Sequence, residues 1–141
     1  MDKKKIIRIV IYVVVAIVAI WILWRVGRKI ADKIASNRKG RELEGSIDYS
    51  KLTYDLPQYN SFATQLYNAM KGSGTTWEVV GEVFGKMETR SDVLMLKKAY
   101  GVKDGEDLEE WIAGETYWPF TGKKEEYINK ILAAKSINYT F

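Results

Sequence analysis

A long apolar segment near the N-terminus limits what this chain can fold into. Between Ile6 and Trp24, 18 of 19 residues are apolar or aromatic, and Arg8 carries the only charge. As a helix rising about 1.5 Å per residue, the segment is roughly 28 Å long, close to the thickness of a bilayer's hydrocarbon layer. Ile and Val are mediocre helix formers in water, but in lipid a helix satisfies every backbone N–H and C=O. The sequence therefore predicts a transmembrane helix.

Two other interpretations of this segment fit less well. A buried core helix would be apolar on one face only. A cleaved signal peptide would share the basic start that Lys3, Lys4 and Lys5 provide, but its apolar stretch would be shorter and would end in small residues, whereas this one ends near Trp21 and Trp24. We interpret the segment as an uncleaved single-pass anchor.

The flanks of the segment suggest how it sits in a membrane. Trp21 and Trp24 stand where an aromatic belt forms, and Arg8 is near enough to one end to reach the interface. Both flanks are basic, but the C-terminal flank has more Lys and Arg, which favours a C-terminal domain on the cytoplasmic or interior side, at a bacterial inner membrane or a virion membrane. The predicted anchor residues are Arg8, Trp21, Trp24, Arg25, Arg28 and Lys29.

Charge is distributed unevenly along the 141 residues. Residues 1–44 contain 11 Lys and Arg against 4 Asp and Glu, and residues 45–141 contain 11 against 14, so the overall charge of +4 divides into +7 and −3. The basic part adjoins the predicted membrane helix, where lipid headgroups are the expected anions. Nucleic acid is expected as a partner only through this basic juxtamembrane segment.

The chain has no His and no Cys, which excludes several chemistries. Disulfides, thiolate or imidazole metal sites, and Ser-His-Asp or Cys-His triads cannot form. The acidic pairs Glu109-Glu110 and Glu125-Glu126 are adjacent in sequence and would point to different helix faces. We therefore expect a protein without catalytic activity.

The pattern divides the chain into three parts. The membrane helix with its basic extension occupies 1–40 and is expected to end at a cap between Asn37 and Gly40. Residues 41–58 show no sustained period and are interpreted as a linker that becomes ordered by packing. Residues 59–141 are expected to form a small helical domain.

Five short helices are predicted in that domain, so the fold class is all-α with one N-terminal transmembrane helix. Apolar residues recur at helical spacing, and no strand candidate competes. The pairs Thr75/Glu78 and Thr89/Asp92 have the spacing of capping boxes. The helices are expected over 58–71, from Thr75 to about Lys86, from Thr89 to Tyr100, from Asp104 or Gly105 onward, and from Thr121 onward.

A resemblance to a known family is carried by four segments in register. The segment Ala69-Met70-Lys71-Gly72-Ser73-Gly74-Thr75 resembles the corner between the first two helices of an annexin repeat, with its Met-Lys-Gly-x-Gly-Thr signature. The other segments are Thr89-Arg90-Ser91, Ala99-Tyr100-Gly101 and Asp107-Leu108. The likeness covers roughly residues 60–135.

The resemblance implies a calcium site and phospholipid binding. Its ligands would be the backbone carbonyls of Met70, Gly72 and Gly74 with the carboxylate of Glu115, an oxygen set that suits Ca²⁺. The chain departs from the family in four ways. It has one repeat where annexins have four, and it has an N-terminal anchor. Thr76-Trp77 follows the motif where annexins usually have Asp-Glu, and residues around 117–122 form an insertion. In the alternative interpretation, the glycines only turn the corner and Glu115 is a solvated acid.

The sequence thus favours a non-catalytic, single-pass membrane-anchored structural or adaptor protein. Its C-terminal Ile137–Phe141 is similar to the ends of small bacteriophage proteins, which suggests a minor component of a membrane-containing virion with capsid or envelope proteins as partners. The aromatic residues Tyr117, Trp118 and Phe120 are the predicted partner contacts. The alternatives are a calcium-dependent phospholipid-binding module and a membrane-active lysis accessory protein.

Overall fold

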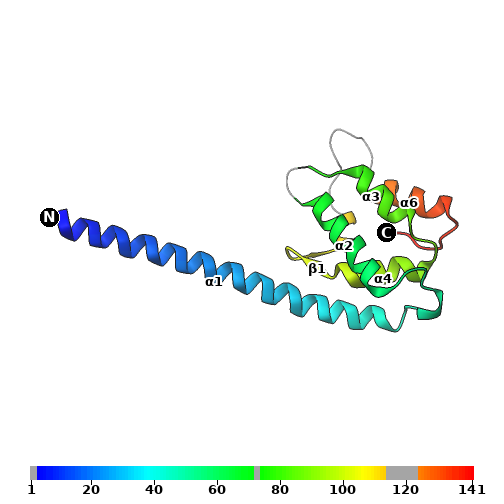
Figure 1. Ribbon diagram of the computed structural model, residues 1–141, viewed down its shortest axis with the longest axis horizontal. Coiled ribbons are helices and arrows are strands. Elements are labelled where there is room, and N and C mark those ends of the chain that lie inside the picture. Colours follow the sequence, from blue (N-terminus) through cyan, green and yellow to red (C-terminus); the bar gives the residue numbers. More distant parts are fainter. Residues whose placement is uncertain (1–2, 72–73, 114–123) are drawn as a thin grey trace.

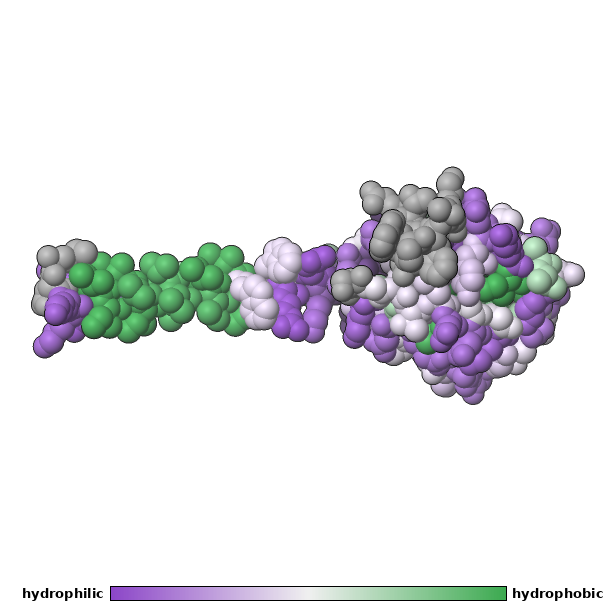
Figure 2. Space-filling view, turned by 90° about the horizontal axis from the view of Figure 1, so that it is seen from above, coloured by the Kyte–Doolittle hydropathy of each residue, from purple (hydrophilic) through white to green (hydrophobic). Residues whose placement is uncertain are grey.

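A long N-terminal helix carries a small helical domain at its C-terminal end. The computed structural model describes residues 3–71, 74–113 and 124–141. Helix α1 is continuous over Lys3–Glu44, and its N-terminal half projects away from the domain (Figure 1). The projecting part is sheathed in apolar side chains, whereas the domain surface is largely hydrophilic (Figure 2). An apolar sheath of this kind is what a lipid-facing helix requires.

Helix α1 ends four residues later than the sequence suggested. The expected cap between Asn37 and Gly40 is not formed, because α1 continues through Glu44. Gly40 is instead buried in the docking contact, where a Cβ would meet the side chain of Lys98 at 3.7 Å. Tertiary packing here overrides the helix-ending tendency of glycine.

The residues expected to form a linker are folded onto the domain. After α1 comes a short 3₁₀ helix, η1 (Tyr49–Lys51), for which the Asp48 carboxylate accepts a hydrogen bond from the Ser50 N–H. Helix α2 (Leu56–Met70) follows after four residues and begins two residues before its predicted start. Its N-cap is Asp55, and Pro57 fits in the first turn because no backbone N–H is needed there.

The all-α prediction is confirmed, and the described residues form five α-helices after α1, which is long and apolar enough to be a candidate membrane span. The remaining helices are α3 (Trp77–Gly85), α4 (Arg90–Tyr100), α5 (Leu108–Ala113) and α6 (Lys124–Ala134). Around α4 the predicted capping box of Thr89 and Asp92 is present, and Gly101 ends the helix. The other predicted box is wrong, because α3 has Thr76 as its N-cap with no side-chain hydrogen bond.

A two-stranded hairpin replaces the expected start of the fourth domain helix. Strands β1 (Val102–Lys103) and β2 (Glu106–Asp107) pair antiparallel. They are joined by Asp104 and Gly105, with φ values of 52° and 86°. Two consecutive positive φ values define a type I′ turn, which Asp-Gly strongly favours. Helix α5 begins only after this turn, where the Asp107 carboxylate accepts from the Glu110 N–H at 2.8 Å.

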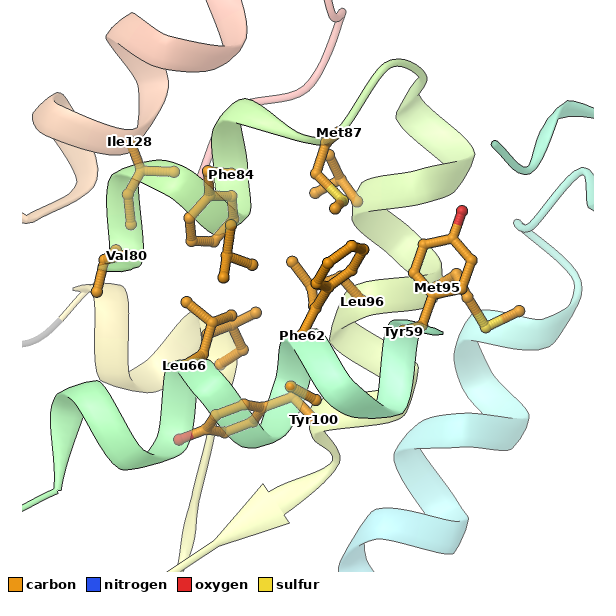
Figure 3. Packing of buried hydrophobic residues seen from close by; sticks show 14 of the residues in the cluster. Tyr59, Phe62, Leu66, Val80, Phe84, Met87, Met95, Leu96, Tyr100 and Ile128 are labelled. Carbon is orange, nitrogen blue, oxygen red and sulfur yellow. The ribbon is translucent and has the colours of Figure 1, made fainter. Parts of the chain in front are cut away.

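The core lies between α2, α3, α4 and α6. Figure 3 shows Phe62 and Leu66 of α2 facing Phe84 of α3 and Leu96 of α4, with Ile128 closing the far side. Each of these five side chains is at most 1% exposed. Full burial of such side chains stabilises by about 1.5–3 kcal/mol each, so this cluster supplies the main driving force for the domain.

One buried carboxylate organises the centre of the domain. Asp92 is 0% exposed and accepts hydrogen bonds from the Thr53 N–H and hydroxyl, the backbone N–H groups of Glu88 and Thr89, and the Tyr59 hydroxyl. Burial raises the pKa of the Asp92 carboxyl, but these donors outweigh it and hold that pKa below its usual value. Asp92 therefore joins the segment before α2 to the start of α4.

The C-terminal tail packs on the domain. The side-chain amide of Asn129 in α6 makes two hydrogen bonds with the backbone of Phe141, at 2.9 and 3.2 Å. The buried ammonium of Lys97 donates to Glu109 and to the Tyr139 hydroxyl, each at 2.7 Å. These contacts fix the end of the chain without a strand.

Candidate membrane-proximal interface

One face of the C-terminal half of α1 docks on the domain. Arg28, Asp32, Ser36 and Lys39 are spaced by four, four and three residues, which places them along one face of a helix. Each of the four contacts the hairpin or the residue at its end. The face therefore binds the segment between α4 and α5 along most of its length.

The Asp32 carboxylate holds the hairpin turn. Its two oxygens accept from the backbone N–H groups of Asp104 and Gly105, each at 3.1 Å. On the other side of the turn, the Tyr67 hydroxyl of α2 donates to the Asp104 carboxylate at 2.9 Å. The turn is thus tied both to α1 and to α2.

Ser36 makes the closest approach between α1 and the domain. Its hydroxyl accepts from the Val102 N–H at 2.7 Å and contacts the Val102 carbonyl at 3.3 Å. A Cβ at the neighbouring Gly101 would lie 2.6 Å from the Ser36 Oγ and 2.9 Å from its Cβ. Gly101 also has a φ of 62° and a ψ of −136°, a region that side chains rarely enter. Position 101 therefore requires glycine for two independent reasons.

An ion pair closes the other end of the hairpin. The Lys39 ammonium lies 2.9 Å from the Asp107 carboxylate, whose side chain is 8% exposed. The hydrogen bond that the Lys39 ammonium donates to the Asp107 carboxylate raises the pKa of Lys39 despite some burial. Burial raises the pKa of Asp107, but the Glu110 N–H and Lys39 outweigh it and lower that pKa. The pair stays ionised across the neutral range, so this contact does not act as a pH switch.

The last turn of α1 contacts α4. The Lys98 ammonium lies 3.4 Å from the Glu44 carboxylate and 3.1 Å from the Tyr49 hydroxyl. The hydrogen bonds that the Lys98 ammonium donates to the Tyr49 hydroxyl and the Glu44 carboxylate raise the pKa of Lys98. Because Gly40 packs beneath the Lys98 stem, helix and domain meet on two sides of α1's C-terminal half.

The predicted anchor residues lie on the exposed part of α1. The Arg25 and Arg28 guanidinium groups lie over the Trp21 and Trp24 rings, 5.2 and 4.7 Å from their centroids. Arg8 and Lys29 are exposed on the same helix. Arg28 has an additional contact, since it donates to the Asp104 carbonyl at 3.4 Å. Over residues 3–71, 74–113 and 124–141, α1 is the helix long and apolar enough to cross a membrane.

The predicted calcium ligands fall partly inside the described residues. Met70 ends α2 with its side chain buried, and Gly74 precedes α3. Gly72 and Glu115 lie outside the described residues, as do the predicted partner contacts Tyr117, Trp118 and Phe120. The described part of the chain holds no cluster of three acidic side chains suited to a metal ion. A calcium site at this corner would therefore depend on backbone carbonyls and on Glu115.

Sequence reasoning missed the docking face, although signals for it were present. Asp104-Gly105 is the sequence signature of a type I′ hairpin turn, and Asp107/Glu110 has the spacing of an N-terminal capping pair. Asp32, Ser36 and Gly101 gave no comparable signal. Their role arises from contacts over 66 to 73 residues of sequence separation.

We expect Asp32→Ala to loosen the hairpin turn without unfolding the domain. Removing the acceptor exposes the amides of Asp104 and Gly105, whose exchange should accelerate about 5- to 10-fold, in line with roughly 1–1.5 kcal/mol for such hydrogen bonds. Hydrogen exchange of the 101–107 peptide measures this. Asp55→Ala, which removes a cap at the start of α2, should leave that peptide unchanged. Equal exchange in Asp32→Ala and the unmodified chain would contradict the assigned contact.

Comparison with known proteins gives a partial similarity. Annexin A8 of Bos taurus and Annexin A8 of Mus musculus are each 35% identical to this chain over 75 residues. The aligned region is 53% of this chain and 23% of each annexin, so the chain spans about a quarter of the length of these curated relatives. No family model matches the chain, and no solved structure matches it significantly. The similarity supports an annexin-like repeat in this chain.

Proposed function

We propose that this protein is a non-catalytic, single-pass membrane protein that holds a one-repeat annexin-like domain in a fixed orientation against one face of a bilayer. The observation that carries the proposal is the continuity of α1 over Lys3–Glu44 together with the docking of its C-terminal half. A helix that runs unbroken from lipid into a docked contact transmits its orientation to the domain. This suits a structural or adaptor role, in which a surface is presented to partners at a set height and angle.

The height of the hairpin above the bilayer core follows from the geometry of α1. Trp24 ends the apolar segment, and Arg28 and Asp32 follow it by four and eight residues. At about 1.5 Å per residue they stand roughly 6 and 12 Å beyond Trp24 along the axis. The polar layer on each side of a bilayer is about 5–8 Å thick, because the core is about 30 Å and the whole about 40–45 Å. The hairpin bound to Arg28 and Asp32 would thus lie at the outer edge of the headgroups.

Single-cysteine labelling tests the membrane topology. The chain has no Cys, so each introduced thiol is unique. In sealed vesicles, we expect a membrane-impermeant maleimide to label Lys3→Cys and Lys130→Cys from opposite sides and Val15→Cys from neither. Labelling of positions 3 and 130 from the same side, or labelling of position 15 without detergent, would refute a spanning helix.

The setting we propose is a membrane-containing assembly such as a phage virion, with capsid or envelope proteins as partners. Support comes from the aromatic side chains of Tyr117, Trp118 and Phe120 in the sequence and from the rigid presentation of the domain. Deleting residues 117–120 should release partner proteins from the domain while α1 stays in the membrane fraction. Undiminished partner recovery after that deletion would argue against this contact segment.

A calcium-dependent phospholipid-binding module is the second candidate. It is favoured by the similarity to Annexin A8. Its ligands would be the carbonyls of Met70, Gly72 and Gly74 and the Glu115 carboxylate. Calorimetry of the full chain in detergent should show calcium binding that Glu115→Gln abolishes. Absence of heat at millimolar calcium would remove this candidate.

A further inference from the structure

A groove lies between the hairpin and the end of α2. In Figure 1 the hairpin extends from the domain along α1, toward the projecting half of that helix. The groove has a volume of about 190 Å³ and includes Lys71, Lys103, Asp104 and Glu106 in its lining. That is room for about six water molecules at bulk density, enough for a small polar group.

Two ammonium groups are held beside one aromatic ring in this groove. The Lys71 and Lys103 ammonium groups lie 5.6 and 5.7 Å from the centroid of the Tyr67 ring, and Lys103 also lies 5.9 Å from that of Tyr100. Neither lysine forms an ion pair with another described residue. Both ammonium groups can therefore donate to one phosphate group of a larger ligand.

Two carboxylates share the groove with these lysines. Asp104 accepts from the Tyr67 hydroxyl through one oxygen, and Glu106 is exposed at the rim. The formal charges of Lys71, Lys103, Asp104 and Glu106 cancel, so the groove has no net attraction for a simple anion. It suits instead a ligand that carries a negative and a positive group close together.

The membrane supplies such a ligand at this height. The hairpin is bound to Arg28 and Asp32, roughly 6–12 Å beyond the end of the apolar segment along the helix axis, where phospholipid headgroups end. An ethanolamine headgroup joins a phosphate to a primary ammonium that donates three hydrogen bonds. A choline headgroup has the same charges but no N–H donors, and a glycerol headgroup has no cation.

We propose that this groove binds the headgroup of an aminophospholipid of the phosphatidylethanolamine type from the bilayer that α1 spans. The phosphate contacts Lys71 and Lys103, and the ammonium contacts Asp104 and Glu106. No metal ion takes part, which separates this site from the calcium site considered above. The proposal rests on the proposed membrane topology, since only a spanning α1 brings the groove to the headgroups.

Native mass spectrometry of the full chain in detergent, titrated with single lipids, tests the proposal. We expect phosphatidylethanolamine to bind at least about tenfold more tightly than phosphatidylcholine or phosphatidylglycerol, with chelator present throughout. Lys103→Gln should weaken ethanolamine lipid binding several-fold, whereas Lys130→Gln, at an exposed position on α6, should not. Glu106→Gln should weaken the binding of phosphatidylethanolamine and strengthen the binding of phosphatidylglycerol.

Several outcomes would overturn the proposal. The proposal fails if the three lipids bind with equal affinity or if phosphatidylglycerol binds as tightly as phosphatidylethanolamine. It also fails if Lys103→Gln binds phosphatidylethanolamine with unchanged affinity. Thermal unfolding of Lys103→Gln serves as the folding control, and we expect only a small fall in the midpoint, because the substitution removes no ion pair among the described residues and the lost contacts with the Tyr67 and Tyr100 rings contribute about 0.5–1 kcal/mol each. Maleimide labelling of Val15→Cys tests whether α1 spans the bilayer, whichever lipid is present. A wrong membrane topology can therefore be distinguished from a groove that does not bind the headgroup.

Discussion

Asp92→Asn is expected to destabilise the domain by about 2–4 kcal/mol, because a hydrogen bond to a charged group contributes about 1.5–3 kcal/mol and leaving a buried polar group unsatisfied costs about 1–3 kcal/mol. The amide would direct donor hydrogens at some of the five donors that the carboxylate now accepts from. For a domain of this size the thermal midpoint should fall by roughly 10–20 °C. Near-UV circular dichroism of the full chain in mild detergent measures it, because that signal reports the packed aromatic residues of the domain.

Asp55→Asn is the matched control for this substitution. Asp55 is also a helix cap, accepting from the Gln58 N–H at 3.0 Å, but it is exposed. Asn is as good an N-cap as Asp, so the change should be within about 0.5 kcal/mol. Equal midpoints for Asp92→Asn and the unmodified chain would show that the Asp92 network does not hold the domain together.

The same carboxylate predicts a pH dependence. Because the folded-state pKa of Asp92 is lowered, its contribution to stability is present above the unfolded value of about 3.9 and is lost as the pH falls through the folded pKa. The unmodified domain should therefore lose part of its stability below about pH 4. The Asp92→Asn variant should lack this pH-dependent contribution to stability. The thermal midpoints of the variant and of the unmodified domain should therefore approach each other as the pH falls.

Gly101→Ala is expected to separate α1 from the domain and to destabilise the domain by about 3 kcal/mol. The positive φ at position 101 costs of order 1–3 kcal/mol for a side chain, and the overlap with Ser36 costs a similar amount in a packed contact. Undocking relieves the overlap but not the backbone strain. Thermal unfolding should show the strain, and limited proteolysis at residues 45–55 should show the undocking.

Ser36→Gly distinguishes the two causes. It removes the Cβ and hydroxyl that a residue 101 side chain would meet, at a cost of about 1 kcal/mol for glycine within a helix. In the double variant the effects should be less than additive by about 1 kcal/mol, because residues in direct contact couple. Strict additivity, or protease resistance of Gly101→Ala equal to that of the unmodified chain, would show that this approach does not set the docking.

The sequence predicted the elements whose signals are local. The length of the apolar segment predicted α1. Apolar residues at helical spacing, together with the Thr89/Asp92 capping box, predicted α4, and Gly101 predicted where α4 ends. Local signals failed where packing or turn chemistry competes with them. Gly40 is typical of a helix end, but here it is buried against Lys98 and the helix continues past it. Helical spacing predicts the start of a helix at Asp104 or Gly105, whereas these two residues form a type I′ turn.

The docking face could not be predicted in the same way. Ser36 and Asp32 are ordinary polar residues on a basic helix, and their partners at Val102, Asp104 and Gly105 are distant in sequence. Which face of α1 meets the hairpin depends on the path of the chain through four intervening elements. Helical periodicity shows that these residues share a face, but not what that face binds.

We expect α1 and the domain to behave as one rigid unit, which the distribution of distances between two spin labels measures. Spin labels at Lys33→Cys on α1 and Lys130→Cys on α6 stand at exposed positions, in a chain with no Cys of its own. Pulsed electron paramagnetic resonance on the full chain in lipid nanodiscs should give a single narrow distance, which Gly101→Ala broadens. A broad distribution in the unmodified chain would mean that the domain hangs from a flexible tether, and would contradict the account.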